Sequence, residues 1–166
     1  KLADWDYILQ VLVIKENIRT GSKPGCFFIV EWNVLQSSHP SHPPGSKAGM
    51  VIRMDVQYPD TPIGEVKGFG AALFGLDPHS TDPAMVARVK AEITPDVVKG
   101  IKSPANPMAG HVVAATVYTK PGNPPFQGKY RFRPVLDETG RPKRLPVPAG
   151  STVPASPPQA PAAAQR

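Results

Sequence analysis

Five stretches of the chain are rich in β-branched and aromatic residues and show partial alternation of apolar and polar side chains, the pattern of β-strands. They are residues 7–14, 26–35, 49–57, 110–119 and 129–136. Another stretch, residues 62–76, places apolar side chains at helical spacing and begins with Pro62, which suits a first helical turn. The pattern predicts three strands, a helix and two further strands, in that order.

Alternation within the strands indicates which side chains face the core. In the second strand, Phe28, Val30 and Trp32 share the predicted core face, whereas Phe27 and Ile29 lie on the opposite face with polar neighbours. The first strand is apolar on both faces; one set holds the odd-numbered residues from Tyr7 to Val13, and the other holds the even-numbered ones up to Ile14. Residues 82–102 predict two helical segments separated at Pro95, the first capped by Asp82.

The order strand–strand–strand–helix–strand–strand is typical of the OB-fold, a five-stranded Greek-key barrel that binds oligonucleotides and oligosaccharides. We therefore predict a mainly β, OB-fold-like barrel over residues 1–137, with the helix between strands 3 and 4. Residues 138–166 have few large apolar side chains and many Pro and Ala residues. We expect them to form a disordered, basic Pro/Ala-rich tail.

Charge and composition reduce the number of functions that the chain could have. The 166-residue chain has a formal net charge of +6, which favours polyanionic partners, although many basic proteins bind none. Its single cysteine, Cys26, excludes an internal disulfide and a Cys-rich zinc site, and we expect it to be buried. No nucleophile, metal-ligand or phosphate-loop motif is present, so we expect a non-enzymatic protein without a cofactor or metal. No membrane span or signal peptide is visible, which favours a cytosolic location.

Cations and aromatic side chains gather where an OB-fold binds its ligand. Lys15, Arg19 and Lys23 lie in the predicted loop 15–25 between strands 1 and 2. Lys120 and Phe126 lie in the predicted loop 120–128 between strands 4 and 5. The alternative for each loop is an ordinary solvent-exposed hairpin without a binding role. In the second loop, Phe126 would then fold back on its own hairpin.

The last strand adds a row of cations. Lys129, Arg131 and Arg133 share one face, and Tyr130 and Phe132 share the other, where Phe132 is expected in the core. Phosphate contacts combined with base stacking are the means by which proteins bind single-stranded DNA. The remaining candidates for such contacts are Arg53, Tyr58, Tyr118, Tyr130 and Trp32, although the pattern favours a core position for Trp32.

A sequence resemblance supports the same interpretation. The segments CFFIVEWNVLQSSHPSHPPGSKAGMVIRM and IGEVKGFGAALFGLDP resemble small phage-encoded OB-fold proteins that bind single-stranded DNA. The resemblance covers roughly residues 7–136 and implies a role in phage DNA replication or recombination, in the cytoplasm of the infected bacterial host. The implied partners are single-stranded DNA or RNA, replication or recombination proteins, and further copies of the chain. Bacterial-type proteins of this kind often recruit partners through an acidic C-terminal tip; this sequence ends AAAQR, so we do not expect recruitment by that route.

One alternative comes from a different class of protein. A small β-barrel with a Pro/Ala-rich extension is also suited to a virion structural or decoration protein. A further alternative is an OB-like adaptor that binds a protein. Binding to a labelled oligonucleotide, measured at two salt concentrations, distinguishes DNA binding from both alternatives, because phosphate contacts weaken steeply as salt is added.

Overall fold

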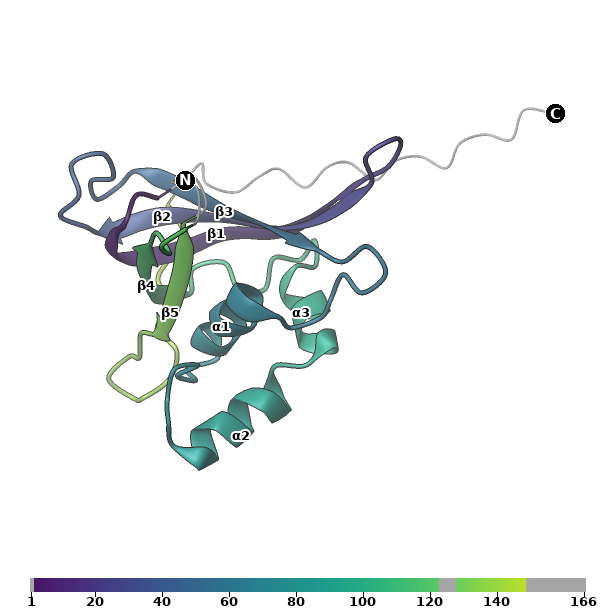
Figure 1. The fold of residues 1–166 in the computed structure, drawn as a ribbon. Helices are drawn as coiled ribbons and strands as arrows, with labels where there is room; N and C mark the ends of the chain where they lie inside the picture. The colour runs from purple at the N-terminus through teal and green to yellow at the C-terminus, as the bar shows by residue number, and fades with distance from the viewer. Residues whose placement is uncertain (1, 123–127, 149–166) are drawn as a thin grey trace.

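The computed structural model describes residues 2–122 and 128–148 and contains an antiparallel sheet covered on one face by helices (Figure 1). The strands are β1 (Trp5–Arg19), β2 (Gly25–Gln36), β3 (Lys47–Met54), β4 (Val112–Tyr118) and β5 (Lys129–Pro134). The helices α1 (Gly64–Leu73), α2 (Pro83–Glu92) and α3 (Pro95–Ile101) all lie between β3 and β4 in the chain. The predicted mainly β class and the predicted order of strands are confirmed.

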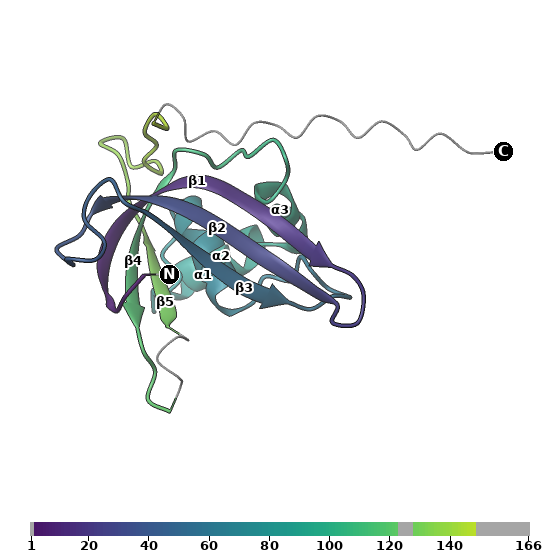
Figure 2. The ribbon, with the colours of Figure 1, turned by 90° about the horizontal axis from the view of Figure 1, so that it is seen from above.

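The five strands form one open sheet in the order β3-β2-β1-β4-β5, and every neighbouring pair is antiparallel. Seen from above, β1, β2 and β3 pass in front of the helices, whereas β4 and β5 lie at one side and run in a different direction (Figure 2). The sheet is therefore strongly bent. Its inner face packs against α1 and α3, and its outer face is partly exposed, with Gln10 covered by residues 145 and 146.

Aromatic side chains fill the space between the sheet and α1. Trp32 from β2 packs against Phe69 of α1, with ring centroids 6.0 Å apart, and Phe69 packs against Phe132 of β5 at 5.0 Å. All three side chains are buried, as is Cys26, which confirms the expected core positions of Trp32, Phe132 and the cysteine. A smaller apolar cluster joins α2 to the end of α1 through Val89, Ile93 and Leu76.

The first strand is longer than predicted and changes face along its length. Val11 pairs with Trp32 and Val13 with Glu31, so Leu12 forms a bulge. The predicted alternation is consequently wrong beyond Val11: Ile14 is buried and Val13 is only partly so. The strand continues to Arg19, which leaves only residues 20–24 for the loop that was predicted over 15–25.

Helices α2 and α3 begin at residues whose side chains accept hydrogen bonds from free backbone N–H groups. Asp82 caps α2 by accepting a hydrogen bond from the N–H of Ala84, as predicted, and Thr94 caps α3. The α1 helix starts at Gly64 and not at Pro62, and its N-cap residue, Ile63, makes no side-chain cap.

The chain after β5 returns to the sheet instead of leaving it. The N–H of Val112 donates to the carbonyl of Lys143 at 2.9 Å, and the N–H of Leu145 donates to the carbonyl of Gly110 at 2.9 Å. Gly110 has a φ of +86°, and a Cβ there would lie 2.4 Å from the Leu145 carbonyl oxygen, so only glycine allows this approach. The folded unit therefore includes residues 138–146, which the sequence assigned to the tail. Residues 149–166 lie outside the described residues.

Candidate nucleic-acid interface

The cations of β5 form a row on the outer face of the sheet. Lys129, Arg131 and Arg133 are exposed and pair across the ladder with Tyr118, Thr116 and Ala114 of β4. The alternation of β5 produces this row, because Tyr130 and Phe132 occupy the intervening positions and point into the core. The guanidinium of Arg131 lies over the ring of Tyr118, 5.8 Å from its centroid.

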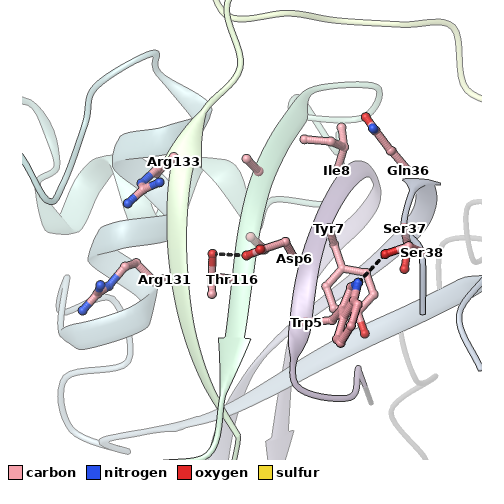
Figure 3. A pocket seen from close by; sticks show the side chains of 12 residues that line it. Trp5, Asp6, Tyr7, Ile8, Gln36, Ser37, Ser38, Thr116, Arg131 and Arg133 are labelled. Carbon is pink, nitrogen blue, oxygen red and sulfur yellow. Dashed lines mark hydrogen bonds between the residues drawn. The ribbon is translucent and has the colours of Figure 1, made fainter.

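A pocket with a volume of about 650 Å³ extends from this row across β4 to the start of β1. We call it the outer pocket; Figure 3 shows Arg131 and Arg133 at one end and Trp5 at the other. Trp5 is 47% exposed, and its indole N–H donates to the Ser38 hydroxyl at 2.7 Å. The His39 ring packs edge-on against the indole, with centroids 5.7 Å apart. These contacts fix an exposed aromatic ring across the outer pocket from the cationic row.

Two carboxylates near the Trp5 end of the outer pocket accept hydrogen bonds from neighbouring groups. Asp6 accepts a hydrogen bond from the Thr116 hydroxyl at 2.6 Å, and Asp4 accepts one from the N–H of Thr119 at 2.7 Å. They reduce the positive potential at the Trp5 end. The positive charge of the outer pocket is therefore concentrated along β5, at Arg131 and Arg133.

The other predicted cations form a second group on the β1–β2 hairpin and β3. Arg19 lies over the Phe27 ring at 4.9 Å, and Arg53 pairs across the ladder with Phe27. Lys23 is exposed at the hairpin tip, whereas Lys15 makes an ion pair of 2.6 Å with Glu31. In both Figure 1 and Figure 2 this hairpin tip lies at the opposite end of the molecule from β4 and β5, so the structure separates the predicted cations into two surfaces.

Two predicted stacking residues are not accessible, and this part of the prediction is corrected. Trp32 is 0% exposed and Tyr130 is 9% exposed, because both face α1 and complete the aromatic core. Burial also raises the pKa of the Tyr130 phenol to about 12. Phe126 lies outside the described residues, and Lys120 is exposed just after β4.

Sequence reasoning missed two aromatic candidates, Trp5, which is exposed, and Phe27, which is partly exposed. Trp5 precedes the predicted first strand, after Ala3-Asp4 and before Asp6. The charged neighbours on both sides are the sequence signal for an aromatic side chain that faces solvent. Phe27 is an aromatic on the face of β2 that the alternation had already assigned to the outside.

Among the residues that the structure describes, no three His, Cys, Asp or Glu side chains are grouped closely enough to hold a metal ion. Within the same part of the chain, no helix has the length and apolar character needed to cross a membrane. In comparisons with known proteins, no family model, curated protein or solved structure matches the chain.

Proposed function

We propose that this chain is a non-enzymatic single-stranded DNA-binding protein that binds the strand through the outer face of β4 and β5. The observation that carries the proposal is the row of Lys129, Arg131 and Arg133 with two exposed aromatic rings, Tyr118 beside it and Trp5 across the outer pocket. A cationic row neutralises successive phosphates, and fixed aromatic rings stack on bases of any sequence. The proposed binding is therefore strong at low salt and weakly selective for sequence.

The strand order supports the finer fold assignment, an OB-fold-like Greek-key barrel that remains partly open. β1 has β2 on one side and β4 on the other, and α1 follows β3, as expected for an OB-fold with its first and fourth strands adjacent. A pocket lined by Ile52 of β3 and Lys129 of β5 lies where such a barrel would close. A role in phage replication or recombination rests on the sequence resemblance.

The proposal is tested by measuring the fluorescence anisotropy of a labelled single-stranded oligonucleotide at two salt concentrations. We expect tight binding at low salt that weakens by orders of magnitude as salt is raised. A duplex of the same sequence is the control, and it should bind more weakly because its bases are not free to stack. Absence of binding at low salt would contradict the proposal and favour the virion structural role; equal binding of duplex would contradict the assignment to single strands.

A further inference from the structure

The gap between β3 and β5 contains a second pocket, distinct from the outer pocket, with a volume of about 500 Å³. We call it the edge pocket. Its apolar wall is formed by Ile52, Ile63 and Tyr118, and its polar groups come from Glu65, His79 and Lys129. Ile63 is 46% exposed and Tyr118 is 39% exposed, so the pocket opens to solvent next to the cationic row.

Glu65 is the unusual group in this pocket. It lies in the first turn of α1 and its side chain is only 20% exposed. Its Oε1 accepts a hydrogen bond from the N–H of Tyr130 at 3.3 Å, and the Lys129 ammonium lies 3.9 Å from the same oxygen. Among the described residues, no hydrogen bond reaches Oε2, and this oxygen is not fully buried, so it remains accessible. A partly buried carboxylate with one accessible oxygen can accept hydrogen bonds from a ligand that carries donors.

We propose that the edge pocket accepts a nucleobase of the bound strand and that Glu65 selects bases with an exocyclic amino group. Its apolar walls suit the faces of a planar ring, and Lys129 at its mouth links the pocket to the phosphate row. A carboxylate accepts a hydrogen bond from the N4 amino group of cytosine, whereas thymine presents the O4 oxygen at that position and repels it. The inference rests on the proposed single-stranded DNA binding and adds a base preference to it.

Oligo-dC and oligo-dT of equal length provide the test, because the two bases have similar size and differ at this amino group. We expect the full chain at neutral pH to bind oligo-dC roughly 5- to 10-fold more tightly than oligo-dT. In Glu65→Gln the side-chain oxygen can still accept the Tyr130 N–H while the amide N–H₂ faces the pocket, so the preference for cytosine should be lost. Glu138→Gln, which changes the net charge equally at an exposed loop position, should retain it.

A second variant tests the pocket without changing its charge. Gly68 lines the edge pocket, and an added Cβ would meet only the Pro78 side chain at 3.9 Å, which is ordinary contact distance. Gly68→Ala should therefore fold normally, reduce the space for a base and lower the preference for oligo-dC. Equal, salt-sensitive binding of both oligonucleotides by the native chain would overturn the base pocket and leave DNA binding intact. Retention of the preference in Glu65→Gln would also overturn it, and binding of neither oligonucleotide would refute both proposals.

Discussion

The side-chain amide of Gln10 donates a hydrogen bond to the carbonyl of Pro146 at 2.9 Å, which joins residues near the two ends of the folded unit. The same nitrogen donates to the carbonyl of Leu145 at 3.1 Å. Gln10 is 1% exposed, so these carbonyls satisfy an amide that is otherwise closed off from water. The segment that follows β5 is therefore part of the fold.

Two truncations test this boundary. Deleting residues 149–166 removes only one large apolar residue, Val153, and we expect the melting temperature to stay within a few degrees of the full chain. Deleting residues 141–166 also removes the partners of Gln10, Val112 and Gly110. Because each of these four hydrogen bonds contributes about 0.5–1.5 kcal/mol net, this deletion should lower the free energy of unfolding by at least about 2 kcal/mol. Thermal denaturation of both proteins measures the difference, and equal stability would contradict the boundary.

The order of the secondary-structure elements was predictable from the sequence. The prediction failed where contacts with residues distant in the chain determine the local structure. The order of strands followed from alternation and turn residues, which are local signals. The bulge at Leu12 is different, because the side-chain amide of Asn106 donates to the Leu12 carbonyl at 2.7 Å and its oxygen accepts from the Ile14 N–H at 3.3 Å. A partner more than ninety residues away in the chain leaves no trace in the local pattern, so the change of face was not predictable.

The candidate site, like the fold, was predictable only where it depends on local sequence pattern. The cationic row of β5 followed from alternation, because exposed and buried residues strictly alternate from Lys129 to Arg133. The separation of Arg19 from Arg131 depends on how far β1 extends and how strongly the sheet bends, and both are properties of the whole fold. Trp5 was missed because its strand begins two residues earlier than the pattern indicated.

Replacing Lys102 with methionine should be strongly destabilising. Its ammonium lies 2.7 Å from Asp60 and is also paired with Glu16, and it is 3% exposed. Burial alone lowers the pKa of Lys102, but the hydrogen bonds to Asp60 and Glu16 outweigh it and raise the pKa above its usual value. The stabilisation is thus complete at neutral pH and is lost only as the pH rises through that raised pKa.

Lys102→Met leaves two carboxylates without their cation, and we expect a loss of about 3–5 kcal/mol in the free energy of unfolding, measured by urea denaturation. Lys99→Met, at an exposed position on α3 one turn before Lys102, is the control and should change little. Similar stability for the two variants would show that the buried ion pairs contribute nothing net.

Glu65 should make stability fall as the pH rises from acid toward neutral. Burial raises the pKa of its carboxyl above the ordinary value, and this effect exceeds the opposing ones of the Tyr130 N–H and Lys129. The folded state therefore holds the Glu65 proton more tightly than the unfolded state, so its contribution is largest below the unfolded pKa and is lost as pH rises through the folded pKa. Glu65→Gln should gain stability over the native chain at neutral pH and lose that advantage in acid. Denaturation curves over this pH range measure the effect, and a constant difference between the two proteins would contradict it.

Trp5→Ala should weaken oligonucleotide binding without unfolding the protein. The exposed indole is held by Ser38 and His39, so it loses little freedom when a base stacks on it. We expect a loss of about 1–3 kcal/mol in binding free energy, with the salt dependence unchanged because stacking releases no counterions. Tyr58→Ala, at a 65% exposed aromatic outside the outer pocket, is the matched control. Equal losses from both variants would argue against a specific stacking site at Trp5.

Arg131→Ala and Arg133→Ala should each reduce the salt dependence of binding while leaving the melting temperature nearly unchanged. Both side chains are exposed on the outer face, so their removal leaves the core intact. Each lost phosphate contact should lower the slope of log affinity against log salt by about one. Arg131→Lys should keep the slope but weaken binding, because lysine retains the charge and loses the planar group that lies over Tyr118.

Variants of two other arginines show where the strand runs. Arg88 is exposed on α2, on neither cationic surface, and Arg88→Ala should bind as the native chain does. Arg19 belongs to the hairpin surface, so Arg19→Ala should alter the slope less than the β5 variants if the strand follows β5. A slope that falls for Arg19→Ala and stays constant for Arg131→Ala and Arg133→Ala would place the phosphate path on the hairpin beside Phe27, and the β5 assignment would then be wrong.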